Sequence, residues 1–215
     1  MIFLRSLIFN VLFYLVLVVL CIIALPALLL PRGALMAIEV AWANTSLFLM
    51  RVICNIRIEF RGVDKIPSGP LIVASKHQSF WETFALVRFF EHPLFILKRE
   101  LMMIPVFGWY LKKVGMISVE RGGGPRSLIK TLKRAAAEVK LGRQLVIFPE
   151  GTRTAPGAAP NYKAGVAQIY AESGVPLPAD RAQFRAVLAA PHLHALSRHA
   201  GGRISRSAAA GIAAR

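Results

Sequence analysis

The distribution of apolar and charged residues sets the beginning of the chain apart from the rest. No charged residue occurs from Ser6 to Pro31, and Arg5 and Arg32 flank this run. As a helix the run would extend roughly 39 Å at about 1.5 Å per residue, more than a hydrocarbon core of about 30 Å. We therefore predict a retained membrane helix that Pro26 ends or kinks. A secretory signal is the alternative, but the run exceeds the usual apolar region of such signals and no small-residue cleavage site follows it.

A second apolar stretch covers residues 33–50 and contains Glu39. It can complete a helical hairpin, lie along the membrane interface or pack on the rest of the protein. Basic residues follow it, namely Arg51, Arg57, Arg61, Lys65 and Lys76. Because basic residues near membrane segments favour the cytoplasm, we predict a location at the inner (cytoplasmic) membrane with the domain that follows on the cytoplasmic side.

The central part alternates short apolar runs with helical patterns. The runs predict strands at residues 56–60, 71–74, 94–97, 116–119 and 145–148, and helices are predicted at 79–90, 125–141 and 163–173. Strands that alternate with helices favour an α/β fold, a mixed sheet flanked by helices. We predict a membrane anchor of one or two helices at 1–50 and a soluble domain at 51–176.

The last part of the chain differs in composition. From Val175 to Arg215, 12 of 41 residues are alanine, six are arginine, and Asp180 is the only acid. Apolar runs that would form further strands are missing. We therefore interpret residues 177–215 as an aberrant tail rather than as a continuation of the domain.

His77 and Glu82 are candidates for acid–base chemistry. His77 falls in the turn after the strand predicted at 71–74, and Glu82 falls in the first turn of the next helix. Residues five apart in one helix point about 140° away from each other, so the two side chains meet only if His77 precedes the helix. Glu82 would then hold one ring nitrogen and leave the other to accept a proton from an alcohol. In the structural alternative, Ser79 and Glu82 form a capping box and His77 is a hydrogen-bonded structural residue.

A second candidate site follows the strand predicted at 145–148, where ligands of α/β sheets bind. In this turn Gly151 permits close approach of the backbone, Thr152 offers a hydroxyl group, and Arg153 supplies a planar fork that suits phosphate. The alternative is a polar surface turn with a solvated arginine.

The charge balance and the cysteines narrow the function classes. The chain has 27 basic and 11 acidic residues, a net charge of +16. Since these residues are scattered without a nucleic-acid-binding motif, we attribute the charge to attraction to anionic lipid and expect no nucleic-acid partner. Cys21 and Cys54 form no metal pattern, and we expect them to be reduced and structural. His192, His194 and His199 lack acidic or thiol companions, so no metal site is predicted.

Four ordered motifs resemble the glycerolipid acyltransferase family typified by 1-acylglycerol-3-phosphate acyltransferases, over approximately residues 50–176. His77 and Glu82 match the first motif, although the family has Asp where this chain has Glu. Residues 95–108 resemble a segment with a phosphate-facing lysine, here Lys98. Residues 115–121 match the second motif, which ends in a phosphate-contacting arginine, here Arg121. Residues 148–153 match the third, Phe-Pro-Glu-Gly-Thr-Arg, nearly letter for letter.

The resemblance implies a glycerol-3-phosphate acyltransferase-like fold and a mechanism. His77, oriented by Glu82, deprotonates the sn-2 hydroxyl of lysophosphatidic acid, which attacks the thioester of an acyl-carrier protein or acyl-CoA to give phosphatidic acid. Lys98, Arg121 and Arg153 hold the phosphate, and Glu150, Gly151 and Thr152 complete the acceptor site. No cofactor is needed beyond the acyl donor. The structural alternatives to phosphate binding are that Lys98 pairs with Glu100 and that Arg121 merely precedes a flexible glycine run.

The resemblance ends near Pro176, where the family's fourth motif, an apolar strand with prolines, would begin. Leu-Pro-Ala-Asp-Arg replaces it at 177–181. Our hypothesis is a reading-frame shift, and translation of the other two frames near codon 176 tests it. A missing strand would expose a sheet edge and reduce activity. Two rival functions stay open: an acyltransferase for another lyso-lipid, such as a lyso-ornithine lipid or a lipid A precursor, and a catalytically silent membrane protein that binds anionic lipid.

Overall fold

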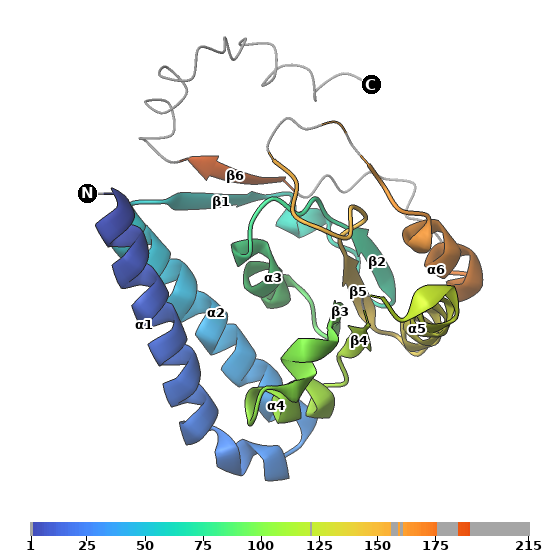
Figure 1. Cartoon of the computed structure of the whole chain (residues 1–215), viewed down its shortest axis with the longest axis horizontal. Helices are drawn as coiled ribbons and strands as arrows, with labels where there is room; N and C mark the ends of the chain where they lie inside the picture. Colours follow the sequence, from blue (N-terminus) through green and yellow to red (C-terminus); the bar gives the residue numbers. More distant parts are fainter. Residues whose placement is uncertain (1, 121, 156–158, 160, 176–184, 190–215) are drawn as a thin grey trace.

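The computed structural model describes residues 2–120, 122–155, 159, 161–175 and 185–189. A helical hairpin forms its N-terminal part (Figure 1): α1 (Ile2–Ile23), a 3₁₀ turn (Leu25–Leu29) and α2 (Arg32–Cys54). As predicted, the first helix ends just before Pro26, which occupies the start of the 3₁₀ turn. Both long helices have the length and apolar composition needed to cross a membrane. Two apolar N-terminal helices indicate membrane association.

The second apolar stretch both completes the hairpin and packs on the rest of the protein. Phe13 of α1 and Trp42 of α2 lie 5.4 Å from the ring of Phe84, measured between centroids. Phe13 also meets Phe80 edge to face, with centroids 5.4 Å apart. Aromatic contacts of this kind add to the burial of apolar area. The hairpin is therefore joined to the α/β part through a cluster of rings.

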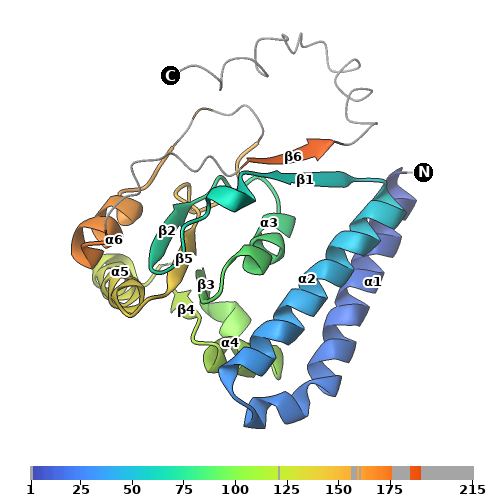
Figure 2. The ribbon, with the colours of Figure 1, turned by 180° about the vertical axis from the view of Figure 1, so that it is seen from behind.

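A four-stranded parallel sheet forms the centre of the α/β part (Figures 1 and 2). Its strands are β2 (Leu71–Ala74), β5 (Gln144–Ile147), β3 (Pro93–Lys98) and β4 (Ile117–Val119), in that order. Neighbouring residues point to opposite faces, so Leu94 and Leu145 pack under the helices α5 (Gly124–Lys140) and α6 (Gly165–Ser173). Phe95 and Val146 pack on the other face, against the hairpin and α4 (Phe107–Lys113). The α/β prediction is confirmed.

The predicted helix at 79–90 is divided in the structure. It consists of α3 (Trp81–Ala85) and a 3₁₀ turn (Leu86–Phe89). The other predicted strands and helices agree with the observed elements to within one or two residues. Short 3₁₀ turns often tighten the end of a helix. The apolar periodicity therefore located the helical segment correctly, but the regular α-helix within it is shorter than predicted.

A second sheet corrects the expectation that the tail forms no further strand. Here β1 (Arg57–Arg61) pairs antiparallel with β6 (Arg185–Ala189). An edge strand offers unpaired N–H and C=O groups, and backbone hydrogen bonds do not require a long apolar run. Composition alone therefore missed this strand. The boundaries predicted at residues 50 and 176 stay predictions.

Arg143 closes the edge of the sheet where the parallel strands begin. The residue is 5% exposed. Its guanidinium donates to the carbonyl oxygens of Pro93 at 2.5 Å, Val114 at 3.2 Å and Gly115 at 2.6 Å. Burial lowers the pKa of Arg143 to about 10, with Arg32 acting in the same direction, while nearby Glu138 opposes the shift. The guanidinium thus stays charged at neutral pH and binds three backbone carbonyls, one at the start of β3 and two in the turn between α4 and β4.

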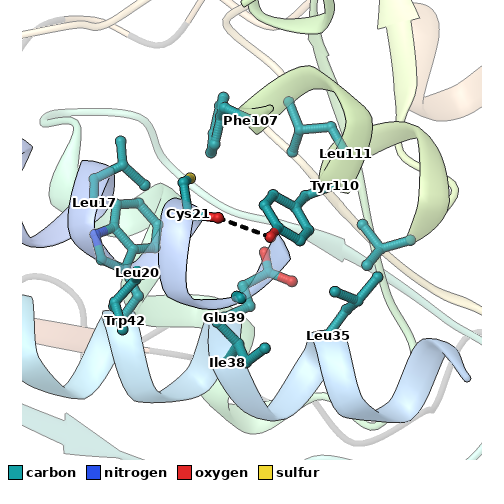
Figure 3. Close-up of a pocket in the computed structure, with 12 residues that line it drawn as sticks. Leu17, Leu20, Cys21, Leu35, Ile38, Glu39, Trp42, Phe107, Tyr110 and Leu111 are labelled. Atoms are coloured by element: carbon teal, nitrogen blue, oxygen red, sulfur yellow. Dashed lines mark hydrogen bonds between the residues drawn. The ribbon is translucent and has the colours of Figure 1, made fainter. Parts of the chain in front are cut away.

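A small apolar cavity of about 90 Å³ lies between the hairpin and α4 (Figure 3). Side chains of α1, α2 and α4 line it, and Glu39 is the acid among them. The Tyr110 hydroxyl donates to the carbonyl oxygen of Cys21 at 2.9 Å, as the figure shows. Burial raises the pKa of Tyr110, so the phenol stays protonated as a donor. Cys21 and Cys54 are free and half-buried.

Candidate active site at the carboxyl edge of the sheet

The candidate residues follow the carboxyl ends of parallel strands. His77 comes three residues after β2, Lys98 ends β3, and the turn from Phe148 follows β5. Because the strands are parallel, these ends lie along one edge of the sheet. Residues 20 to 70 positions apart in sequence are therefore brought to the same edge.

His77 and Glu82 form the hydrogen-bonded pair that their spacing allows. Glu82 lies in the first turn of α3, and its Oε2 is 3.0 Å from the Nδ1 of His77. The same carboxylate accepts the backbone N–H groups of Gln78 at 3.0 Å and Ser79 at 3.1 Å. Glu82 is 8% exposed, so these bonds form in a largely dry environment. A carboxylate on Nδ1 favours the tautomer whose Nε2 is free to accept a proton.

Glu82 therefore makes both sets of predicted contacts, with His77 and with the backbone at the start of α3. The bond from the Ser79 N–H to Glu82 is one half of a capping box. The helix begins after Phe80 without a side-chain cap, so the other half is not formed. Glu82 fixes both the helix start and the imidazole, and a change at this position affects both.

The third motif holds His77 from the other side. The ring of Phe148 stacks on the imidazole, with centroids 4.2 Å apart and planes 24° from parallel. The backbone N–H of Thr154 donates to the carbonyl oxygen of His77 at 2.8 Å. Sequence reasoning assigned no role to either residue, although both lie in or beside the third motif. The imidazole is thus fixed between a carboxylate and an aromatic ring.

The turn of the third motif has an unusual backbone and a buried acid. Gly151 has φ of +66°, a left-handed conformation that favours glycine, and its N–H donates to the carbonyl oxygen of Phe148 at 3.0 Å. Glu150 is 4% exposed, and its Oε2 has no hydrogen-bond partner among the described residues. Since buried polar atoms are normally bonded, this oxygen has acceptor capacity for a water or a substrate group.

Of the three candidate phosphate-binding cations, the structure describes Lys98 and Arg153 but not Arg121. Lys98, Thr152 and Arg153 are exposed at the carboxyl edge. Arg121 lies outside the described residues, but its neighbour Glu120 pairs with Arg99 at 2.7 Å, next to Lys98. Within the described part of the chain no ion pair joins Lys98 to Glu100. Lys98 and Arg153 are therefore available to bind an anion.

Lys163 lies beside the third motif, although the sequence did not identify it as a candidate site residue. Its backbone N–H donates to the carbonyl oxygen of Pro149 at 2.9 Å, which ties the start of α6 to the third motif. In the described residues no group of three or more His, Cys, Asp or Glu side chains comes together. His192, His194 and His199 lie outside those residues.

Comparison with known proteins identifies the family. The sequence profile of the Acyltransferase family matches residues 57–178, more than half of the chain. The chain belongs to this family. It is 39% identical over 137 residues to the 1-acyl-sn-glycerol-3-phosphate acyltransferase of Pseudomonas aeruginosa, covering 63% of this chain and 53% of that protein. It is 33% identical over 110 residues to the lyso-ornithine lipid O-acyltransferase of the same organism, covering 51% and 42%.

A solved structure supports the fold. The 1-acyl-sn-glycerophosphate acyltransferase of Thermotoga maritima superposes with a TM-score of 0.62 at 22% identity, over 80% of this chain and 72% of that chain. The chain spans about half the length of the curated relatives it matches. Family membership and fold are thus established, and the reaction is inferred from the site.

Proposed function

We propose that this chain is an O-acyltransferase that transfers a fatty acyl group from a thioester to the sn-2 hydroxyl of lysophosphatidic acid, giving phosphatidic acid. The observation that carries the proposal is the His77–Glu82 pair, held at 3.0 Å beside the arginine-bearing turn of the third motif. The names of the relatives support the same acceptor. The acyl donor is an acyl-carrier protein or acyl-CoA, and no other cofactor takes part.

The proposed reaction uses His77 as a general base. Its Nε2 accepts the proton of the sn-2 hydroxyl while the hydroxyl oxygen attacks the thioester carbonyl carbon. When the tetrahedral intermediate collapses, the carbon–sulfur bond breaks and the imidazolium returns its proton to the leaving thiolate. Glu82 stabilises the imidazolium through Nδ1. No acyl-enzyme forms, because the base activates the acceptor directly.

The cations supply the binding site for the acceptor phosphate. We assign Lys98, Arg121 and Arg153 to the phosphate, and Glu150, Gly151 and Thr152 to the shape and polarity of the acceptor site. A guanidinium can bind two phosphate oxygens at once, which fixes the distance from the phosphate to the reacting hydroxyl. The apolar hairpin would hold the site at the cytoplasmic face of the inner membrane, where both lipids are available.

The test is acyl transfer by membranes that contain this chain, from acyl-carrier-protein and CoA thioesters of defined length to a panel of lyso-lipids. Turnover with lysophosphatidic acid that His77→Ala abolishes supports the proposal. Binding of anionic lipid without turnover, unchanged by His77→Ala, would establish the silent lipid-binding alternative instead.

A lyso-ornithine lipid is the second candidate acceptor. The match to a lyso-ornithine lipid acyltransferase favours it. That headgroup carries a carboxylate in place of the phosphate, and arginine binds both groups, so the two acceptors are compared directly by kcat/KM in the same panel. The panel therefore separates the two acceptors.

A further inference from the structure

Helix α5 carries basic side chains along its outer side. Arg126, Lys130, Lys133, Arg134 and Lys140 are exposed, and at about 100° per residue they lie within about 120° of one another around the helix. We call these five residues the basic stripe. The opposite side of α5 is buried against the sheet and α6. From its first to its last residue the stripe extends roughly 21 Å, at about 1.5 Å per residue.

The fold makes no use of these charges. Among the described residues no ion pair includes a member of the basic stripe. Glu138 is the only acid in α5, and its carboxylate lies 3.4 Å from the guanidinium of Arg143 instead. Cations three or four residues apart on one helix repel each other, so the stripe weakens the helix rather than supporting it. Stability therefore does not explain the stripe.

The basic stripe faces away from the apolar hairpin. The helices α5 and α6 cover one face of the sheet, and the hairpin and α4 cover the other (Figures 1 and 2). A bilayer in contact with the exposed apolar side of α1 lies beyond the opposite face of the sheet from the stripe. Salt screens charges over about 8 to 10 Å at physiological ionic strength. Attraction to that bilayer therefore does not account for the stripe, and the lipid explanation of the net charge does not extend to α5.

The shape of this surface suits a protein partner. Small molecules bind mainly in concave pockets, whereas the stripe lies on the convex side of a helix. Neither the cavity beside α4 nor a groove of about 500 Å³ between β2 and α6 is lined by a residue of α5. A second copy of this chain has the same net charge of +16, so its charge does not complement the stripe. A water-soluble protein with an acidic surface does.

The stripe begins at the edge of the sheet that holds the candidate active site. The carboxyl end of β4 is at Val119, and α5 starts five residues later at Gly124. Arg126 and Lys130 therefore lie at the carboxyl edge, and α5 then runs back toward the amino edge. A protein bound to the first half of α5 would lie beside the edge that holds His77.

We propose that the basic stripe is the docking surface for the acyl-carrier protein that delivers the acyl group. This assignment rests on the proposed function, because the carrier protein is the one protein among the partners of that reaction. Acidic side chains of the carrier protein pair with the stripe, which raises the rate of association and fixes the orientation of the complex. Acyl-CoA carries no such protein surface, so its use does not involve the stripe.

The test compares two donors with the same acyl group, palmitoyl carrier protein and palmitoyl-CoA, on membranes that contain the full chain. The variant R126Q/K130Q/K133Q removes three charges at exposed positions, and glutamine has a high helix propensity. We expect KM for the palmitoyl carrier protein to rise at least about tenfold, while KM for palmitoyl-CoA changes less than about twofold. An equal change with both donors, or no change with the carrier protein, would overturn the proposal.

A matched control removes the same charge elsewhere. The variant R51Q/K112Q/K113Q changes three exposed cations outside α5. Both KM values should stay within about twofold of those of the unaltered chain, because the effect depends on the place of the charges and not on their number. A rise in KM for the carrier protein as large as that of the stripe variant would mean that net charge alone is responsible, which also overturns the proposal.

A binding measurement separates failure of this proposal from failure of the proposed function. Palmitoyl carrier protein is titrated onto His77→Ala protein in detergent micelles, with and without the three stripe substitutions. Affinity that falls at least about tenfold with the substitutions, and that falls with added NaCl, supports docking without any turnover. Equal affinity of the two proteins overturns docking and leaves transfer from acyl-CoA untouched. If the stripe variant instead loses binding to phosphatidylglycerol vesicles while its affinity for the carrier protein is unchanged, the stripe binds the membrane and the proposal is wrong.

Discussion

Charged side chains at the two edges of the four-stranded sheet differ in burial and in their hydrogen-bond partners. At the amino edge the buried guanidinium of Arg143 donates to three backbone carbonyls, at the start of β3 and in the turn before β4. At the carboxyl edge Lys98 and Arg153 are exposed, and a buried oxygen of Glu150 has no partner among the described residues. At the amino edge Arg143 binds groups of the protein itself, whereas the charged side chains at the carboxyl edge are available to bind a ligand.

This difference separates residues that maintain the fold from residues that carry the proposed reaction. The buried guanidinium of Arg143 stabilises its surroundings through the three carbonyls that it binds, although its Nε has no partner among the described residues, and removing it leaves those carbonyls without their donor. An exposed cation contributes little to stability. Substitutions at the two edges should therefore change different measurements, and four predictions test this separation.

His77→Ala should have the largest effect on activity. Loss of the general base should lower kcat by about 10³-fold or more, while the melting temperature falls only modestly, because Glu82 keeps its two backbone donors when the ring is removed. Initial rates and thermal unfolding on the same preparation measure both quantities. The matched control is His92→Ala, an exposed histidine before β3, which should retain its rate. Equal losses in the two variants would contradict a catalytic role.

Arg143→Met should have the opposite profile. Removing the guanidinium leaves the carbonyls of Pro93, Val114 and Gly115 without their donor, which should cost about 3 kcal/mol of unfolding free energy. Activity per folded molecule should stay close to normal. Denaturant unfolding measures the change, and Arg134→Met on the exposed face of α5 is the control. A stable but inactive Arg143→Met protein would break the comparison between the edges.

Glu82→Gln should change both measurements, because this side chain orients His77 and accepts the N–H groups at the start of α3. We expect kcat to fall about 10²-fold and stability to fall by about 1 kcal/mol. Glu82→Asp keeps the carboxylate and should recover most of the rate. If Asp and Gln variants lose the same activity, Glu82 acts only in the helix start.

Arg153→Lys should have the smallest effect, on substrate binding. Loss of the two-pronged contact with phosphate should raise KM for lysophosphatidic acid by about tenfold, with kcat changed less. Stability should be unaffected, since the side chain is exposed. Steady-state kinetics measure the change, with Arg134→Lys as the control. A fall in kcat at unchanged KM would assign Arg153 to the chemical step.

Much of the fold and the site could be predicted from the sequence. Alternating apolar runs and helical periods located the strands of the parallel sheet and the main helices, because burial imposes those periods locally. The spacing of His77 and Glu82 allowed a contact across a strand-to-helix turn. The division of the helix predicted at 79–90 into α3 and a 3₁₀ turn and the pairing of β1 with β6 were missed, since both depend on partners distant in the sequence.

Local pattern and motif by themselves determined the α/β class, the apolar anchor and the chemical types available for the reaction. Only the tertiary structure decided that Phe148 stacks on the imidazole and that Arg143 binds the carbonyls of Pro93, Val114 and Gly115. Those contacts join residues roughly 30 to 70 positions apart, and strand order, which no local period encodes, brings them together.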